Sequence, residues 1–485
     1  MAISADTFFL DPAFAGTLQK QIQSMVAEGI LSGRFRPGEK LPSSRGLARH
    51  LGISRITVTL AYTELQADDY VVSRGRSGYF VSETAPQPRI KGAVTRREDT
   101  VDWESIVGTR YSALRQVEKP EDWQNYRYPF IYGQADPSLF DHANWRLCAL
   151  QALGQRDFNA MTSDYFERDD PKLVEFIARH SLPRRGILAD ADEILVTLGA
   201  QNALWIAAEV LLAEGRTAVI ESPCYPGLSS VLAETGCRVE AISVDAGGLP
   251  PKRIPKKADV VFTTPSHHCP TSVTMPLDRR STLLERASRD DFVVVEDDYE
   301  FEMSLLTPPS PALKSLDREG RVVHIGSFSK SLFPGLRLGY LVGPVAFIRE
   351  ARALRSLLFR HPPGHIQRTA AYFMSLGHYD ALIKRMARAF GKRRKVMAEA
   401  IRDAGLEVAG GGEGGSSFWI RAPEGVDTEE LAGRLRDKSV LIEPGAVFFP
   451  EKHPSRRYFR LAYSSIPEAR IPEGIALIAE AIAES

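Results

Sequence analysis

The chain has 485 residues, of which 44% are hydrophobic and 25% are charged, as is usual for a globular protein. Lys plus Arg and Asp plus Glu each number 61, so the formal net charge is zero. This balance excludes a chain that is basic throughout, as a nucleic-acid coat would be, but not a local basic patch. The length indicates about two to four domains. Four cysteines are too few for a disulfide framework in so long a chain, which favours a reducing compartment.

The sequence has no segment typical of export or membrane insertion. The first residues lack a basic stretch followed by an apolar run, so we expect no signal peptide. The most apolar helical stretch, residues 203–213, is short and contains Glu209, so we expect no membrane span. These features predict a cytoplasmic protein.

Changes in composition divide the chain into three parts. Residues 12–83 favour tight helices followed by a hairpin, whereas residues 84–126 carry scattered charge and no sustained apolar period, as a linker with one short helix near residues 103–114 would. In residues 127–485, short apolar strands alternate with helical patterns, which predicts an α/β domain on a mostly parallel sheet. The clearest strands are residues 194–197, 218–220, 260–263, 292–296 and 322–326.

The first part contains the signals of two consecutive helices and a hairpin. Pro42 and Ser43 suit the start of a helix, Gly52 its end, and Ser54 the cap of the next helix. Two helices joined at a glycine turn match a helix-turn-helix. Two short apolar strands then flank a basic tip at residues 74–78, which predicts a wing.

A local excess of positive charge accompanies these helices. Residues 34–55 contain six basic residues and one acidic residue, an excess that suits phosphate. The start of the second helix is where a recognition helix meets base edges, so Arg55 could reach guanine, while Arg45 would hold backbone phosphate. The alternative is a small structural bundle with a charged, solvated face.

Residues 41–58 read LPSSRGLARHLGISRITV, and with the hairpin they resemble the winged helix-turn-helix of GntR-type regulators over residues 18–81. The resemblance implies double-stranded DNA as a partner. It implies that DNA is contacted by Arg45, Ser54, Arg55, Thr57, Arg74 and Arg76. One departure is Asp68-Asp69, where such domains usually have a glycine before the aromatic residue; we place these acids away from the groove.

The most informative segment of the third part is residues 327–340, which read SFSKSLFPGLRLGY. Lys330 follows an apolar strand, where burying a lone ammonium costs free energy. An amine desolvated there loses its proton more easily and can attack an aldehyde to form a Schiff base. Ser327, Ser329 and Arg337 would suit a phosphate dianion. An aldehyde and a phosphate on one small ring indicate pyridoxal 5′-phosphate, although an ordinary lysine after a strand is the alternative for this residue alone.

Three further segments point to the same cofactor. Gly199, Ala200 and Gln201 lie between a strand and a helix, where backbone amides can face an anion. The alternative is that these residues form an ordinary turn between the two elements. The acids at residues 296–298 end an apolar strand, and one of them could pair with a pyridinium nitrogen while Tyr299 donates to the ring oxygen. Arg460 lies in an apolar run and suits an acid group of a ligand or a structural ion pair.

These segments, in this order, resemble a fold-type I aminotransferase of the aspartate aminotransferase superfamily over about residues 130–483. The resemblance implies a Schiff base at Lys330, Asp297 on the pyridine nitrogen, Tyr299 on O3′ and Tyr225 stacked on the ring. It also implies that Tyr165 reaches the phosphate of a neighbouring subunit, and therefore a homodimer with shared sites.

The segment 264–272 departs from the enzymes' Asn-Pro-Thr-Gly motif, with Cys269 at the asparagine and Ser272 at the glycine. The asparagine normally touches the ring oxygen, so its absence weakens the case for efficient transamination. His267, His268 and Cys269 are adjacent and cannot easily point at one ion, so we expect no metal.

The two halves together resemble the MocR subfamily of GntR regulators, which carry an aminotransferase-like domain as a sensor. The resemblance implies that an amine or amino acid displaces Lys330 as an external aldimine and so changes DNA affinity. Two alternatives remain: an active aminotransferase with an accessory DNA-binding arm, and a DNA-binding protein that has lost the cofactor.

Overall fold

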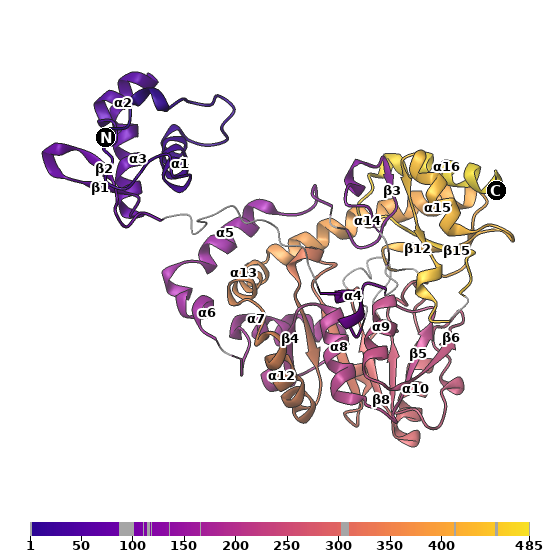
Figure 1. The fold of residues 1–485 in the computed structure, drawn as a ribbon. Coiled ribbons are helices and arrows are strands. Elements are labelled where there is room, and N and C mark those ends of the chain that lie inside the picture. The colour runs from indigo at the N-terminus through magenta and orange to yellow at the C-terminus, as the bar shows by residue number, and fades with distance from the viewer. Residues whose placement is uncertain are drawn as a thin grey trace. The chain divides into compact units, whose positions relative to one another are not determined.

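The computed structural model describes two compact units, Met1–Thr109 and Arg110–Ser485 (Figure 1). The described residues are 2–86, 101–109, 111–113, 117, 119–134, 136–164, 166–301, 310–411, 414–451 and 454–484.

The first unit is a three-helix domain with a β-hairpin. Its elements are α1 (Leu18–Leu31), α2 (Ser44–Leu51), α3 (Arg55–Ala67), β1 (Val71–Ser73) and β2 (Tyr79–Val81). The side chains of Ser43 and Ser54 accept from the amides of Gly46 and Ile56, and Gly52 ends α2 with a φ of 68°. The predicted helix caps and hairpin are therefore confirmed, because each rests on a local hydrogen bond or backbone angle.

The core of this unit comes from one face of each helix and from the hairpin. Its fully buried side chains include Ile22, Val26, Leu47, Val58, Tyr62, Val71 and Val81. Asp69, between α3 and β1, has a φ of 59°, the left-handed region that glycine adopts most easily. This explains why a glycine is usual at this point and why an aspartate, which tolerates that region, replaces it.

The second unit is built on a seven-stranded sheet in the order β4-β10-β9-β8-β7-β5-β6. Its strands are β4 (Ile194–Thr197), β5 (Thr217–Ser222), β6 (Arg238–Ser243), β7 (Val260–Thr263), β8 (Val293–Asp297), β9 (Val322–Ser327) and β10 (Gly339–Val342). β10 runs antiparallel to both β4 and β9, and the pairs from β9 to β6 are parallel. The expectation of a mostly parallel sheet is confirmed, and the antiparallel β10 is an addition to it.

Helices cover both faces of this sheet (Figure 1). One apolar cluster joins the strands to α8 (Ala200–Leu211), α9 (Pro226–Glu234) and α12 (Val345–Phe359), and another joins them to α10 (Leu277–Asp290). The edge strand β4 and its neighbour β10 also contribute to a third cluster that includes α7 (Pro171–Phe176) and α13 (Gly364–Ser375). Strands β4, β5 and β7 are buried along their whole length, as is typical of a parallel sheet covered on both faces, whereas most of the edge strand β6 is exposed.

A smaller part of the second unit holds a four-stranded antiparallel sheet in the order β11-β12-β15-β14. The strands are β11 (Glu407–Val408), β12 (Ser417–Arg421), β14 (Glu443–Pro444) and β15 (Tyr458–Ala462). Helices α14 (His378–Asp403), α15 (Thr428–Asp437) and α16 (Ile471–Ala483) accompany it. β3 (Tyr128–Pro129) pairs in parallel with β13 (Val440–Leu441), which ties the start of this unit to its end.

Among the described residues of the segment predicted as a linker, α4 covers Trp103–Ile106, and 3-10 turns span Tyr111–Ala113 and Trp123–Asn125. Residues 87–100 lie outside the described part of the chain.

Candidate functional site

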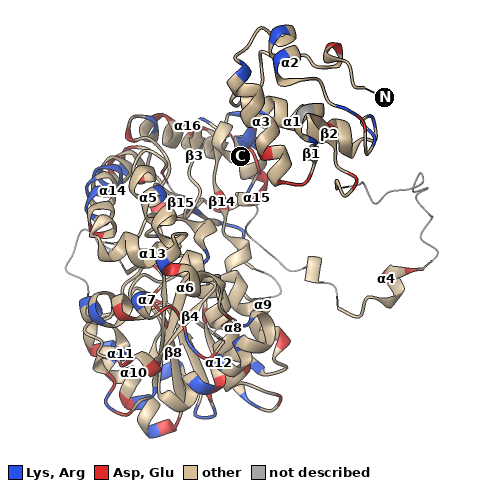
Figure 2. Ribbon diagram, turned by 90° about the vertical axis from the view of Figure 1, so that its left-hand side faces the viewer, with Lys and Arg blue, Asp and Glu red and all other residues tan. Residues whose placement is uncertain are grey.

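Two places in the chain gather side chains suited to binding, and the first is the start of α3. Ser54 and Arg55 are exposed there and Thr57 is half-buried, while Arg45 is exposed on α2. Figure 2 shows basic residues on α2. Ile56 is 69% exposed beside Arg55, and an apolar side chain at this position can contact a thymine methyl group. Ile56 was not singled out from the sequence, since an isolated isoleucine carries no polar signal.

The tip of the hairpin carries the other two arginines of the predicted DNA interface. The Arg74 guanidinium lies 4.9 Å from the centre of the Phe80 ring, and its Nη2 is 3.4 Å from Glu83 Oε1. Gly75 and Gly78 have positive φ values, so the tip turns sharply. The side chain of Arg76 lies outside what the structure describes.

The second place is the end of β9, where Lys330 emerges. Its Nζ lies 4.2 Å from the centre of the Tyr132 ring, and a Cβ on Gly133 would stand only 2.0 Å from it. Burial lowers the pKa of the Lys330 amine to about 8, although the carboxylate of Glu300 opposes the shift. The amine is therefore largely available as a nucleophile at mildly alkaline pH.

The acids that end β8 have different surroundings, and these decide which could face a cofactor. Glu296 pairs with His324 at 3.0 Å, and Asp298 pairs with Arg185 at 2.6 Å. Asp297 is buried, and its Oδ1 has no hydrogen-bond partner among the described residues. Burial, and then the charge of Asp298, raise the pKa of Asp297 to about 8. A buried carboxyl of this kind fits a ring nitrogen that carries a proton.

Gly199, Ser329 and Arg337 come together where α8 begins. Gly199 has a φ of 86°, and a Cβ there would lie 3.2 Å from Arg337 Nη2 and 3.5 Å from Ser329 Oγ. Ser329 Oγ is buried without a partner among the described residues, while Arg337 Nη2 donates to the Leu198 carbonyl at 2.8 Å. Ala200 and Gln201 form the first turn of α8, whose amides face this point. A guanidinium, a hydroxyl and a helix N-terminus together fit a phosphate.

The remaining predicted residues lie around these two groups. Tyr225 Oη donates to Gln201 Oε1 at 3.1 Å, and Tyr299 Oη donates to the His267 carbonyl at 3.1 Å. Ser327 Oγ accepts from the Ser329 amide at 3.3 Å. Tyr225 and Tyr299 pack in one cluster with Cys269. Tyr165 lies outside the described residues.

Arg460 lies on β15 and forms a buried ion pair with Glu443 on β14. Its Nε donates to Glu443 Oε2 at 2.7 Å, and its guanidinium lies between the rings of Tyr132, at 4.1 Å, and Phe448, at 4.7 Å. Of the two alternatives drawn from the sequence, the structure therefore records the ion pair. Lys330 lies against the same Tyr132 ring, so Arg460 is close to the candidate site.

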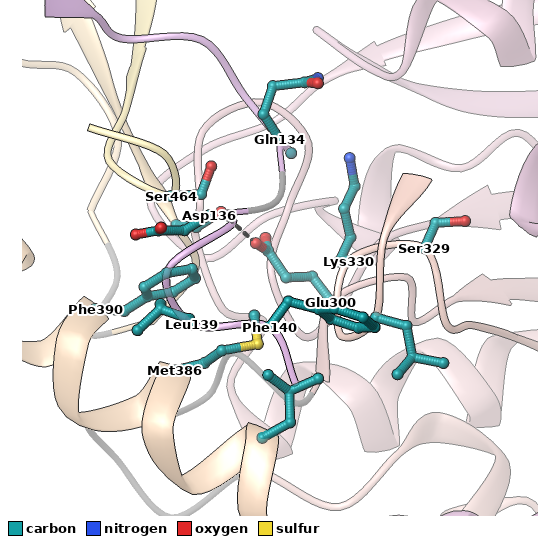
Figure 3. Close-up of a pocket in the computed structure, with 14 residues that line it drawn as sticks. Gln134, Asp136, Leu139, Phe140, Glu300, Ser329, Lys330, Met386, Phe390 and Ser464 are labelled. Carbon is teal, nitrogen blue, oxygen red and sulfur yellow. Dashed lines mark hydrogen bonds between the residues drawn. The ribbon is translucent and has the colours of Figure 1, made fainter. Parts of the chain in front are cut away.

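Lys330 also lines a cavity with residues that sequence reasoning missed (Figure 3). The polar side chains that line this cavity include Gln134, Glu300, Ser416 and Ser464. Ser416 Oγ donates to Glu300 Oε1. Glu300 continues the acidic run at residues 296–298 and could have been proposed from it. Gln134 and Ser464 carry no local signal, because only the tertiary fold brings them to Lys330.

The described residues offer neither a metal cluster nor a membrane-spanning helix. No group of three or more His, Cys, Asp or Glu side chains in that part of the chain could hold a metal ion. Within the same ranges, no helix is long and apolar enough to cross a membrane. His268, one of the three adjacent candidates, instead has Nδ1 2.7 Å from Thr271 Oγ1.

Known proteins resemble both units of the chain. Residues 18–81 match the family described as bacterial regulatory proteins, gntR family, and residues 141–478 match aminotransferase class I and II. The chain is 58% identical to the HTH-type transcriptional regulator TauR of Rhodobacter capsulatus over 483 residues, covering 99% of this chain and 100% of that one. It is 28% identical to the probable rhizopine catabolism regulatory protein MocR of Rhizobium meliloti, covering 94% and 92%.

Solved structures resemble the second unit. The kynurenine aminotransferase of Pyrococcus horikoshii, solved with PMP, superposes with a TM-score of 0.72 at 28% identity, over 79% of this chain and 98% of that one. LysN of Thermus thermophilus, an α-aminoadipate aminotransferase complexed with N-(5′-phosphopyridoxyl)-L-leucine, shares the fold with a TM-score of 0.71 at 24% identity, over 79% and 99%.

The chain belongs to the MocR-type GntR regulators, with an N-terminal winged helix-turn-helix and a fold-type I aminotransferase domain. It is a DNA-binding transcriptional regulator, and pyridoxal phosphate is its cofactor. The predicted fold class, family, regulatory function and cofactor are thereby confirmed. The residues present fit this cofactor, because Asp297 Oδ1 and Ser329 Oγ are buried polar atoms without partners among the described residues.

Proposed function

We propose that the second unit is a sensor that binds an amine or amino acid at pyridoxal phosphate and thereby changes the affinity of the first unit for a double-stranded DNA operator in the cytoplasm. The observation that carries the proposal is the buried amine of Lys330, whose pKa is lowered to about 8. Such an amine, beside Asp297 and the Gly199 turn and in one chain with a helix-turn-helix, is suited to reversible amine exchange.

Each residue has a role that follows from its surroundings. Lys330 would hold the cofactor covalently, Asp297 would keep the ring nitrogen protonated, and Ser329 with Arg337 would bind the phosphate. Tyr225 and Tyr299 would line the ring. When bound, pyridoxal phosphate supplies an aldehyde carbon that can pass from the lysine amine to the amine of a ligand.

Cys269 favours sensing over turnover. It is 6% exposed, and burial raises the pKa of its thiol to about 11, so it stays neutral. A thiol is a weak hydrogen-bond donor, in contrast to the asparagine amide that aminotransferases carry at this point. The rival function, an active aminotransferase, keeps Lys330 as a candidate base for proton transfer.

A row of exposed apolar side chains supports the homodimer as part of this proposal. Leu147 and Leu150 on α5 (His142–Ala152), with Leu153 just after it, are 62%, 56% and 53% exposed and recur every three residues. Phe158, at the start of α6 (Phe158–Thr162), is 54% exposed. A second copy would cover this surface, because monomers rarely expose contiguous apolar patches. Light scattering of the wild type and of Leu150→Glu tests it; a monomeric wild type would refute it.

The test of sensing is an absorbance titration of the full-length protein with a panel of amino acids and amines. We expect a visible band that is absent in Lys330→Ala, kept in the surface control Lys392→Ala, and shifted by one ligand class without release of keto acid. Rapid keto-acid release would support the aminotransferase instead. A band that is identical in Lys330→Ala would refute Lys330 as the anchor, and with it the sensor.

A further inference from the structure

The end of the predicted linker lies against the cofactor site. Val117 is half-buried and packs against an apolar cluster formed by Cys269, Trp419 and Phe448. Tyr225 and Tyr299, the two tyrosines assigned to the ring, pack on the same cluster. Val117 therefore shares its packing with the side chains that would surround the cofactor.

A second residue of the same segment contacts a side chain that lines the cavity at Lys330. Lys119 Nζ donates to Gln134 Oε1 at 3.2 Å, and Gln134 Nε2 donates to the Tyr132 carbonyl at 3.2 Å. Gln134 lines the cavity together with Lys330, and both side chains extend toward the same end of it (Figure 3). The Lys119 ammonium also lies 5.7 Å from the centre of the Trp123 ring.

These contacts belong to the second unit itself, since residues 110–485 form one compact unit. Along the chain, however, residues 117 and 119 directly follow the segment that leads from the helix-turn-helix. A ligand in the cavity would thus contact side chains, such as Gln134, that residues 117 and 119 support from the other side.

We propose that Val117 and Lys119 support the wall of the ligand pocket from behind, Val117 through the Cys269 cluster and Lys119 through Gln134, so that a bound ligand holds the end of the linker against the second unit. The inference rests on the proposed sensor function and names the residues through which it acts on the linker. A ligand that binds only when residues 117 and 119 pack on the second unit stabilises that packing. Binding of the ligand and packing of these two residues are therefore linked in one equilibrium.

The test uses the full-length protein loaded with pyridoxal phosphate and the probe aminooxyacetate, which replaces the lysine amine on the aldehyde carbon. The rate at which the probe bleaches the visible band reports access to the pocket. We expect Val117→Asp to raise this rate by about tenfold, equivalent to ~1.4 kcal/mol, and Lys119→Ala to raise it less. Val101→Asp and Glu121→Ala, at exposed positions, serve as matched controls and should leave it unchanged.

A second readout follows the segment directly. Hydrogen exchange of the backbone amides in residues 111–126 should slow when the wild type is loaded and treated with the probe, and should not slow in Val117→Asp. Unchanged bleaching in both variants, with unchanged exchange in the wild type, would overturn the inference while the sensor stood. A wild type without a Lys330-dependent band would overturn the sensor, and the inference with it.

Discussion

Arg460 Nε and Glu443 Oε2 lie 2.7 Å apart in a buried ion pair next to the Tyr132 ring that Lys330 also contacts. Both side chains are 6% exposed. The guanidinium that suits an acid group of a ligand is thus already neutralised by a residue of the chain. Under the proposed function, a ligand carboxylate would compete with Glu443 for Arg460, and this pair would then help to determine which amines are bound.

Glu443→Gln should raise the affinity for acid-bearing amines. The amide keeps a hydrogen-bond acceptor for Arg460 Nε but removes the competing charge, so we expect amino acids to bind about tenfold more tightly and simple alkylamines to bind as before, a gain typical of one charge-assisted hydrogen bond. Absorbance titrations measure both. Glu407→Gln, at an exposed ion pair with Arg421, is the control. Equal gains for both ligand classes would contradict this role of the pair.

The pKa of Asp297, raised to about 8, predicts a pH dependence of stability. Between the ordinary carboxyl pKa and pH 8, Asp297 keeps its proton in the folded protein without cofactor, whereas the unfolded chain has lost it. The free energy of unfolding therefore falls as the pH rises toward 8. The expected slope is about −1.4 kcal/mol per pH unit in that window. Asp297→Asn should lack this slope when urea unfolding is followed between pH 5 and 8. An unchanged slope would show that Asp297 is not the group.

The lowered pKa of Lys330 predicts a second pH dependence, that of the rate of cofactor uptake, which should rise with pH. In the proposed function its neutral amine would be the nucleophile, and burial lowers its pKa to about 8. The rate at which the cofactor-free protein takes up pyridoxal phosphate should therefore rise about tenfold per pH unit below 8 and level off above it. Stopped-flow absorbance measures this rate. A plateau that begins only near the ordinary lysine pKa would contradict a desolvated amine.

Gly199→Ala should weaken binding of the cofactor phosphate. The φ of 86° is unfavourable for alanine, and its Cβ would stand 3.2 Å from Arg337 Nη2 where the phosphate is expected. Strain of about 1–2 kcal/mol at this turn corresponds to roughly a tenfold or greater loss of affinity for pyridoxal phosphate. Gly433→Ala, in α15 with open space around it, is the control and should bind the cofactor normally.

Arg45 and Arg55 should respond differently to replacement by alanine. If Arg45 holds a phosphate as predicted, Arg45→Ala should lower the salt slope of DNA binding by about one unit on every sequence. Arg55→Ala should instead cost about 1–3 kcal/mol on the operator and relax its specificity. Fluorescence anisotropy with operator and random duplexes separates the two. Lys20→Ala, exposed on α1, should change neither. If Arg55→Ala lost the same affinity for both duplexes, Arg55 would contact the DNA backbone and not the bases.

The helix-turn-helix and the lysine were foreseeable because their signals are local. The caps at Ser43 and Ser54 and the glycine after α2 each depend on atoms a few residues apart, and these interactions form in the same way in almost any tertiary setting. Lys330 was recognisable since an amine after a fully apolar strand is costly wherever that strand is buried. Sequence alone therefore determined the two kinds of domain, and it led to the proposal of Lys330 as the anchor of the cofactor.

The partners of the site were decided only by the tertiary structure. Glu443 meets Arg460 through the pairing of β14 with β15, and three acids in a row acquire different roles because His324 and Arg185 neutralise Glu296 and Asp298 from other elements. The packing of Val117 on the cluster of Cys269, Trp419 and Phe448 likewise joins segments far apart in the chain. Such pairings depend on which surfaces pack together, and no short-range periodicity or cap carries that information.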